Sequence, residues 1–359
     1  MNYAQRRQKA VDLLTALQLD ALVLCEPENI RYLCGFTGSD GTLIISKEQL
    51  VFLTDSRYTT QAGIEVSADR IEEYTVKSDA IVAVLSTLSV KRAGFEAGLA
   101  VGVFNDLRGK GEDDWQWLPL QDEIQSLRLH KSAEEIRLIS AAAEMNLAGF
   151  TEVSSMIRPG VSESEISLAL EFALRKRGAE EKAFDIIVAS GERGALPHGV
   201  ASDKLLAEGE LVTIDFGCRY AGYHSDETVT FALGRVADEL REIYDIVLEA
   251  HDRAIAAVVP GIGLSELDRI ARDYIKGCGY ADYFGHGLGH GVGLAVHEAP
   301  VVASRSKAVA EAGMVFTVEP GIYVPGTGGI RIEDMVLVTV DGHQVLTKIP
   351  KTFQNILLR

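Results

Sequence analysis

An internal repeat in the second half of the chain constrains the fold more than any other feature of the sequence. Residues 157–163 read IRPGVSE and are echoed by residues 258–266, which read VVPGIGLSE, and each copy is expected to begin a helix at its Ser-Glu pair, Ser162-Glu163 and Ser265-Glu266. Residues 209–217 read GELVTIDFG and are echoed by residues 313–321, which read GMVFTVEPG. Two copies are too few for a solenoid, which needs about three or more. The repeat therefore predicts one pseudo-symmetric domain with a site between its halves.

Each copy of the repeat brings a pair of carboxylates. Asp215 lies in the first apolar segment and Asp226 follows it, whereas Glu319 lies in the second segment and Glu333 follows that one. Alternate side chains of a strand point to the same face. Each strand would thus offer one carboxylate to a common polar side, with apolar residues packed behind it. Arg331 shares a strand face with Glu333, which favours a supporting role beside that carboxylate.

These acids point to a metal site. A single acid in a strand is more often a solvated edge residue, but the position of Asp215 in an apolar strand is repeated at Glu319. Burying four carboxylates together is prohibitive unless protons or cations neutralise them. Two divalent metal ions would do so. Oxygen-rich ligation with a single imidazole favours Mn²⁺ or Co²⁺, with Fe²⁺ or Zn²⁺ as alternatives. A dinuclear site can hold a bridging hydroxide and polarise a carbonyl.

Histidines cluster in a glycine-rich segment. Residues 285–293 read GHGLGHGVG and carry His286 and His290, and His297 follows shortly after. Glycines let the backbone approach a site closely. The segment is not a dinucleotide fingerprint, because Val292 stands where the last glycine is required. His198 occupies the equivalent place in the first half of the repeat. The other histidines are interpreted as surface or satisfied core residues: His130, His224, His251 and His343.

The first part of the chain has a different pattern. Residues 1–125 alternate between helical and strand periodicity, which predicts a small α/β domain. Strands are expected at 21–24, 42–46 and 51–54, and helices near 10–17 and from 57 to 63. Ser132 and Glu135 then form a capping box that begins a long helix through about Phe150. The boundary between the two predicted domains falls before this helix, and the second domain covers residues 126–359.

The composition of the chain argues against some classes of partner and some cellular locations. The chain has 52 acidic and 35 basic residues and a formal net charge of −17, without the basic stripe that nucleic acid requires. Its four cysteines form no C-x-x-C pair, which indicates a reduced protein. No apolar run approaches the roughly 20 residues that span a bilayer, and no signal peptide is recognisable. We expect a soluble cytoplasmic protein that binds neither nucleic acid nor membranes.

The ordered motifs of the second half resemble those of the Xaa-Pro peptidases, prolidase and aminopeptidase P, of the creatinase/methionine-aminopeptidase superfamily (family M24). The motifs are IDFG at 214–217, YHSD at 223–226, HGLGH at 286–290, VHE at 296–298, VEPGIY at 318–323 and GIRIED at 329–334. NIRYL at 29–33 and GFTGS at 35–39 resemble the creatinase-type N-terminal domain. The resemblance covers essentially the whole chain. It implies an α/β (α+β) fold in which that N-terminal domain precedes a pita-bread catalytic domain.

The resemblance also implies a metal ligand set. Asp215 would bind one metal ion, and His290 and Glu319 would bind the other. Asp226 and Glu333 would bridge the two ions. Glu319 would in addition carry the proton during catalysis. The family resemblance, rather than the spacing of these residues, assigns the separate roles.

Four further residues would handle the substrate. By the same resemblance, His198 and His297 would hold the substrate carbonyl and the tetrahedral intermediate. His286 would line the proline pocket, and Arg331 would support the metal-bound carboxylates. The implied reaction is hydrolysis of the Xaa-Pro bond of dipeptides or short peptides by a metal-bridging hydroxide, in a homodimer. A bond to proline is a tertiary amide without an N–H, so peptidases that grip an extended strand fit it poorly.

Two departures from the family pattern bear on the substrate. Many relatives carry an arginine soon after the position of Asp226, where this chain has Val229. Prolidases often have an arginine after the proline of the His-Glu-x-Pro motif, where Val301 stands here. The second departure leaves aminopeptidase P activity as an alternative to dipeptidase activity. A creatinase-like amidinohydrolase and a non-catalytic binding protein are further alternatives, although both would be expected to lack metal ligands that this chain retains.

Overall fold

The computed structural model describes residues 1–352 and 355–356, and the chain divides into two compact units, Met1–Arg128 and Leu129–Arg359. Residues 357–359, at the end of the predicted second domain, lie outside the described residues. Both units mix helices and strands, so the predicted α/β class is confirmed. Among the described residues, no helix has both the length and the apolar character needed to cross a bilayer.

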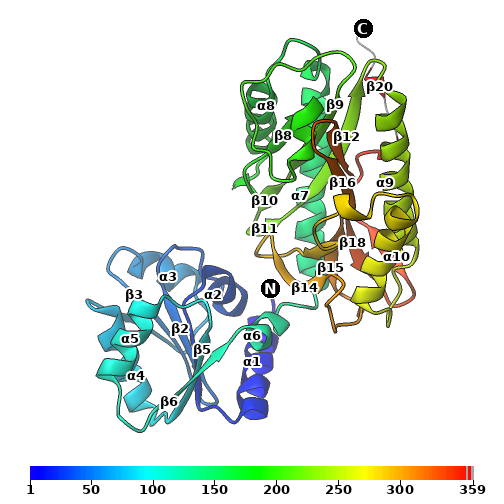
Figure 1. The fold of residues 1–359 in the computed structure, drawn as a ribbon. Coiled ribbons are helices and arrows are strands. Elements are labelled where there is room, and N and C mark those ends of the chain that lie inside the picture. Colours follow the sequence, from blue (N-terminus) through cyan, green and yellow to red (C-terminus); the bar gives the residue numbers. More distant parts are fainter. Residues whose placement is uncertain (353–354, 357–359) are drawn as a thin grey trace. The chain divides into compact units, whose positions relative to one another are not determined.

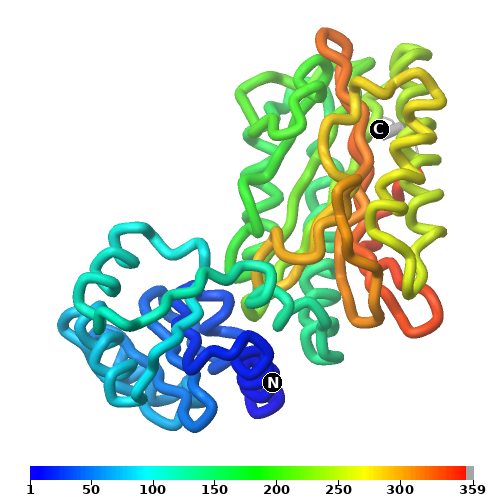
Figure 2. Tube along the Cα trace, turned by 60° about the horizontal axis from the view of Figure 1, so that its bottom comes forward, coloured from blue at the N-terminus to red at the C-terminus, as the bar shows by residue number. Residues whose placement is uncertain are grey.

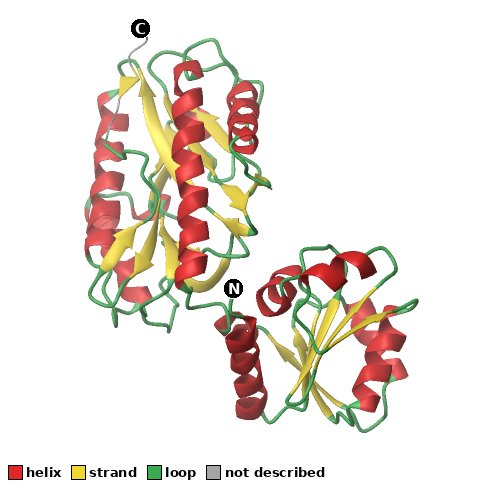
Figure 3. Ribbon diagram, turned by 180° about the vertical axis from the view of Figure 1, so that it is seen from behind, coloured by secondary structure: helices red, strands yellow, loops and turns green. Residues whose placement is uncertain are grey.

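The N-terminal unit is a six-stranded sheet with helices on both of its faces (Figure 3). The strand order is β4-β3-β2-β1-β5-β6, in which β1 runs antiparallel to β2 and parallel to β5. Val23 and Ile44 of the sheet pack with Ile81 and Leu85 of α4 in one apolar core. The strands are β1 (Ala21–Leu24), β2 (Thr42–Ser46), β3 (Leu50–Thr54), β4 (Arg70–Glu73), β5 (Arg92–Glu96) and β6 (Gln116–Leu120). The helices are α1 (Tyr3–Leu17), α2 (Pro27–Cys34), α3 (Thr59–Glu65), α4 (Lys77–Thr87), α5 (Val101–Lys110) and α6 (Asp122–Ser126).

The predicted elements of this unit are present, but the helix predicted near residues 10–17 already begins at Tyr3, and the other elements differ by small shifts at their ends. The first two predicted strands have the expected bounds, and the third begins one residue early, at Leu50. The helix predicted from residue 57 begins instead at Thr59. Asp55 explains the delay, because its side chain accepts a hydrogen bond from the backbone N–H of Arg57 and holds residues 55–58 in a turn.

The first half of the second unit packs two helices against one sheet, shown in green in Figure 2. The sheet has the order β20-β12-β9-β8, and β9 runs antiparallel to both of its neighbours. Phe150 of α7 stacks on Phe231 of β12 at a centroid distance of 5.1 Å. The main elements are α7 (Ala133–Val153), α8 (Glu163–Lys176), β8 (Ile187–Ser190), β9 (Leu211–Phe216), β12 (Glu227–Leu233) and β20 (Asn355–Ile356). The shorter ones are η1 (Ser154–Met156), β7 (Glu181–Lys182), η2 (Gly191–Ala195), β10 (Cys218–Tyr220) and β11 (Tyr223–His224).

The second half repeats this plan, in yellow to red beside the first (Figures 1 and 2). A five-stranded sheet has the order β14-β13-β15-β18-β19, and β15 runs antiparallel to both of its neighbours, as β9 does. Leu267 and Ile275 of α10 share a core with Phe316 of β15. The elements are α9 (Asp238–Ala256), α10 (Leu264–Gly277), η3 (Ala281–Tyr283), β13 (Gly289–Gly291), β14 (Glu298–Val302), β15 (Val315–Val318), β16 (Gly321–Val324), β17 (Gly328–Arg331), β18 (Asp334–Val338) and β19 (His343–Val345).

The sequence repeat corresponds to a repeat of local structure. Gly209 and Gly313, which precede the two equivalent strands, have φ values of +85° and +94°, where residues other than glycine are strained. The helices differ more. Ser162 caps α8 with a side-chain hydrogen bond, as predicted. The second copy was expected to begin its helix at Ser265, but α10 begins at Leu264 with Gly263 as an N-cap that has no side chain to donate or accept.

Candidate metal centre

A cavity of about 830 Å³ in the second unit collects the predicted site residues. This volume is within the range of pockets that bind small molecules. Its lining includes residues from both halves of the unit, among them all nine candidates: His198, Asp215, Asp226, His286, His290, His297, Glu319, Arg331 and Glu333. The sequence repeat thus brings two strand-and-loop systems to one polar cavity.

The carboxylates reach the cavity from the ends of paired strands. Asp215 is the fifth residue of β9 and lies opposite Thr228 of β12. Asp226 comes directly before β12, and Glu333 directly before β18. Thr228 donates a hydrogen bond of 2.6 Å to Glu333, which joins the two halves of the unit. The alternation predicted for these residues applies in a strand to Asp215 alone, because Asp226, Glu319 and Glu333 each lie next to the end of a strand, and β17 ends at Arg331. Arg331 pairs with Asp215.

Three of the side chains are close enough to share one metal ion. Ligand atoms of Asp226, His290 and Glu333 all lie within 4.8 Å of one another. The His290 Nε2 atom is also 3.3 Å from a carboxylate oxygen of Glu319. The backbone N–H of His290 donates to Thr317 Oγ1, and Thr317 donates to Glu319. Residues of β13 and β15 therefore fix the imidazole beside the acids.

The charge balance of this cluster fits bound cations. Burial and the neighbouring carboxylates raise the pKa of Asp226 and of Glu333 well above the usual range, and burial raises the pKa of Glu319 to about 7. Among the described residues that line the cavity, Arg331 is the one lysine or arginine. Asp215 Oδ1 is buried without a hydrogen-bond partner among the described residues. A divalent cation would supply both the missing charge and the missing partner.

Arg331 organises the floor of the cavity. Its guanidinium donates to Asp215 at 2.6 Å, to Thr228 at 3.1 Å and to the Tyr323 hydroxyl at 2.9 Å. It also donates to the backbone carbonyl of Pro197 at 3.1 Å. Arg331 thus makes four hydrogen bonds, and these connect a carboxylate of β9 to the loop that carries His198.

The histidines differ in environment. Burial lowers the pKa of His290 and of His286 to about 4, so both are neutral near pH 7, and a neutral imidazole is the form that ligates a metal. His286 Nε2 lies 3.0 Å from the Tyr323 hydroxyl. His198 and His297 are exposed at the cavity wall. The His297 ring lies 4.1 Å from that of His290, centroid to centroid.

Some polar residues around the site were not singled out from the sequence. Tyr323 lines the cavity and joins His286 to Arg331, and strand alternation from Gly321 could have indicated its face. Behind the ligands, Lys351 pairs with Glu227 at 2.7 Å and with Asp334 at 3.3 Å. These two acids directly follow Asp226 and Glu333 in the chain, but no spacing signal links them to a lysine so far away in the sequence.

Comparisons with known proteins agree with this geometry. Residues 137–340 match the metallopeptidase family M24, and residues 6–130 match the creatinase/prolidase N-terminal domain. An Xaa-Pro dipeptidase of Pyrococcus furiosus is 39% identical over 346 residues, which are 96% of this chain and 98% of that protein.

Solved structures extend the likeness to the whole fold. The structure of an Xaa-Pro dipeptidase from Bacillus anthracis has a TM-score of 0.95 at 42% identity and covers 99% of this chain and 100% of its own. An X-Pro aminopeptidase from Thermotoga maritima has a TM-score of 0.89 at 37% identity, with 98% and 99% covered. The chain belongs to metallopeptidase family M24 and is a hydrolase with a creatinase/prolidase-type N-terminal domain.

Proposed function

We propose that this chain is a metal-dependent exopeptidase that hydrolyses the bond between an N-terminal residue and proline. The observation that carries the proposal is the buried cluster of carboxylates with His290 in one cavity, where Asp215 Oδ1 has no partner among the described residues. Relatives whose names specify Xaa-Pro dipeptidase activity cover nearly the full length of the chain, which supports the choice of substrate.

The proposed ligands are Asp215, Asp226, His290, Glu319 and Glu333. Two divalent ions would neutralise the carboxylates, polarise the scissile carbonyl and activate water for attack. The oxygen-rich set with a single imidazole favours Mn²⁺, with Co²⁺ next, over the softer metals. Thr228 and Thr317 hold the carboxylates of Glu333 and Glu319, and Arg331 orients Asp215.

Protons and the substrate are handled by side chains at the rim of this cluster. Glu319, whose pKa is raised to about 7 in the metal-free chain, would take a proton from water and pass it to the proline nitrogen. His198 and His297 would donate hydrogen bonds to the substrate carbonyl and to the oxyanion that develops from it. His286, held by Tyr323, would pack against the proline ring.

The two candidate activities, dipeptidase and aminopeptidase P, differ in the length of the peptide they accept. One observation favours peptides longer than two residues. A dipeptide presents a free carboxylate directly on the proline. The one lysine or arginine among the described lining residues is Arg331, and its guanidinium already donates hydrogen bonds to Asp215, Thr228, Tyr323 and the carbonyl of Pro197. Val301 is 60% exposed at the cavity and offers no charge. Aminopeptidase P activity on longer peptides is therefore the second candidate function.

Assembly and location complete the proposal. We propose a homodimer, as the family resemblance suggests, and a cytoplasmic location, which the four free cysteines support. Light scattering of the purified protein would test the dimer. A mass of one chain across micromolar concentrations would contradict it.

The activity is tested with metal-loaded protein and three peptides: Ala-Pro, Ala-Pro-Ala and Ala-Ala-Ala. We expect release of alanine from one or both of the proline peptides and little from Ala-Ala-Ala. Faster hydrolysis of Ala-Pro would identify a dipeptidase, and faster hydrolysis of Ala-Pro-Ala an aminopeptidase P. No turnover of either proline peptide with both metals bound would refute the proposal, and activity that survives exhaustive chelation would favour an amidinohydrolase-like reaction instead.

A further inference from the structure

Two loops of the second unit carry histidines to the cavity, and each loop is tied to a buried carboxylate on a helix. His198 lies in the connection between β8 and β9. His286 lies between η3 and β13. The carboxylates are Glu163, the first residue of α8, and Asp268 of α10, and both have no exposed surface. Neither of them lines the cavity.

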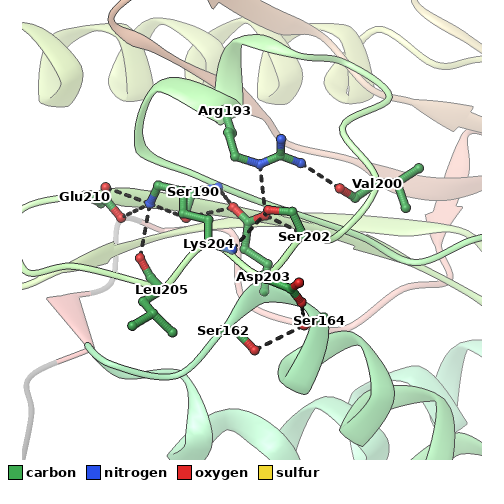
Figure 4. Close-up of polar contacts among 11 residues, drawn as sticks. Ser162, Ser164, Ser190, Arg193, Val200, Ser202, Asp203, Lys204, Leu205 and Glu210 are labelled. Carbon is green, nitrogen blue, oxygen red and sulfur yellow. Dashed lines mark hydrogen bonds and ion pairs between the residues drawn. The ribbon is translucent and has the colours of Figure 1, made fainter.

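Glu163 accepts hydrogen bonds from both sides of the His198 loop. One oxygen accepts from the backbone N–H and the hydroxyl of Ser190, both at 2.8 Å. The other accepts from Arg193 Nε at 2.9 Å, and from the N–H and the hydroxyl of Ser202 at 3.1 and 2.7 Å. In Figure 4, dashed lines from Ser190, Arg193 and Ser202 meet at the one carboxylate that lies between these three labelled residues. One buried carboxylate therefore clamps the chain before and after His198.

The clamp continues across the loop itself. Arg193 donates a second hydrogen bond, of 2.6 Å, to the carbonyl of Val200. Lys204 donates to the hydroxyl of Ser190 and to Glu210, both at 2.8 Å (Figure 4). With the contact from Arg331 to Pro197, the residues on both sides of His198 are fixed. The imidazole of His198 stays exposed at the cavity wall, so its position depends on the backbone that carries it.

Asp268 makes a comparable set of contacts in the second half, although it is not the repeat equivalent of Glu163, and it acts through an arginine one helical turn away. Its two oxygens accept from Arg272, each at 2.8 Å, and one also accepts from the N–H of Leu288 at 3.1 Å. Arg272 in turn donates to the carbonyls of Phe284 at 2.9 Å and of His286 at 2.7 Å. Phe284, His286 and Leu288 are thus held by Asp268 and Arg272 of one helix.

We propose that Glu163 and Asp268 are positioning residues, which hold the loops of His198 and His286 in the geometry that the substrate requires. Hydrogen bonds to a charged acceptor are stronger and more directional than neutral ones. An amide in place of either carboxylate presents an NH₂ group to donors and cannot satisfy them all. The inference rests on the proposed function, because it takes both histidines as groups that contact the substrate.

Matched pairs of variants on the same helices test the inference. We expect Glu163→Gln and Asp268→Asn each to lower kcat/KM for the proline peptide by about tenfold or more, since displacements near 1 Å can cost that much. Glu165→Gln removes the charge of the capping-box partner of Ser162 on α8 but keeps an oxygen that can accept its hydrogen bonds, and Glu266→Gln removes an exposed acid of α10. Neither control touches a histidine loop, so both should keep kcat/KM within about twofold of the unsubstituted protein.

A second substitution separates positioning from general loss of structure. In a chain that already carries His198→Ala, Glu163→Gln should lower kcat/KM by less than about twofold, because it acts through a side chain that is no longer there. Asp268→Asn should keep its full effect in that background. Equal losses from Glu163→Gln with and without His198 would overturn the inference. Arg193 is partly exposed, so Arg193→Met provides a second test if Glu163→Gln fails to fold. It should lower kcat/KM in the unsubstituted chain and have little further effect in the chain that carries His198→Ala.

Amide hydrogen exchange gives a readout that does not depend on turnover. Glu163→Gln should speed exchange at residues 190–204 and leave residues 284–288 unchanged, and Asp268→Asn should do the reverse. If the unsubstituted enzyme cleaves no proline peptide while this exchange pattern appears, the proposed function fails and the loop clamps stand. If it cleaves the peptides but neither variant changes exchange or kcat/KM, the inference fails alone.

Discussion

Arg331 illustrates how much of the candidate metal centre depends on a residue that is not a ligand. Its planar guanidinium contacts Asp215, Thr228, Tyr323 and the carbonyl of Pro197 in four directions. The sequence predicted its closeness to the carboxylates from strand alternation. The contact with Tyr323 follows from the pairing of β16 with β17, which the sequence analysis did not predict. The contact with Pro197 could not be predicted, because Pro197 belongs to the other half of the unit and its proximity depends on the packing of the two halves.

Replacing Arg331 by lysine keeps the positive charge but removes the planar guanidinium with its several N–H donors. A single ammonium cannot reach all four partners, so Asp215 loses its fixed orientation. We expect Arg331→Lys to weaken metal affinity by about 10- to 100-fold, the usual cost of losing a group that orients a ligand. Isothermal titration of Mn²⁺ would measure this. The control is Arg305→Lys at an exposed position, and equal affinities in the two variants would contradict the role given to Arg331.

The raised pKa values of Asp226, Glu319 and Glu333 predict how stability depends on metal and pH. In the metal-free chain these groups hold protons when folded that they lose when unfolded. Their contribution to stability is therefore full below about pH 4 and declines as the pH rises toward the raised pKa of Glu319, about 7. Bound cations keep the carboxylates ionised and remove this decline.

We expect the difference in Tm between Mn²⁺-loaded and metal-free protein to widen as the pH rises from 5 to 8. The lowered pKa values of His286 and His297 change the stability of the Mn²⁺-loaded and the metal-free protein alike, so their effect cancels in the difference between the two Tm values. Calorimetry at constant ionic strength measures the two Tm values. A difference that is constant or shrinks over this range would show that the carboxylate cluster does not take up the metal.

At the scale of the elements, a capping box predicted a helix start correctly, whereas apolar periodicity did not predict all the residues that the helix buries. The capping box at Ser132 begins α7 as expected. The buried face of α7 also includes Glu135 and Asn146, which a purely apolar periodicity does not select. Glu135 accepts a hydrogen bond from Tyr223, and Asn146 accepts one from Ser225. These polar contacts pair residues 88 and 79 positions apart and follow from tertiary packing, so the sequence pattern could not show them.

The glycine-rich segment around β13 offers a test at this scale. A Cβ atom on Gly289 would lie 1.9 Å from the backbone carbonyl oxygen of Thr317, whereas a Cβ on Gly285 would meet nothing within 4 Å. We expect Gly289→Ala to force β13 away from β15, at a cost of about 2 kcal/mol or more, and so to lower Tm by about 4 °C or more. Gly285→Ala should change Tm by about 1 °C or less. Similar Tm values for the two variants, measured by calorimetry, would contradict the close packing of β13.

At the scale of the whole molecule, the repeat and the change of periodicity predicted two parts, and the chain does divide into two compact units. The proposed ligands all belong to the second unit. The domain boundary between residues 125 and 126 stays a prediction, namely that the chain on its C-terminal side folds independently. We expect a fragment of residues 126–359 to fold and to bind metal with its ligand set complete. Circular dichroism and a metal titration test this, and a fragment without a cooperative melting transition would contradict it.

The central claim is that hydrolysis before proline depends on metal ions held by Asp215, Asp226, His290, Glu319 and Glu333. The most direct measurement titrates Mn²⁺ into chelator-treated protein while bound metal and Ala-Pro-Ala hydrolysis are recorded together. We predict no activity without metal, and a rate that rises with occupancy and levels off at about two ions per chain. Full hydrolysis without metal, or saturation of two sites without any hydrolysis of Ala-Pro-Ala or Ala-Pro, would contradict the account.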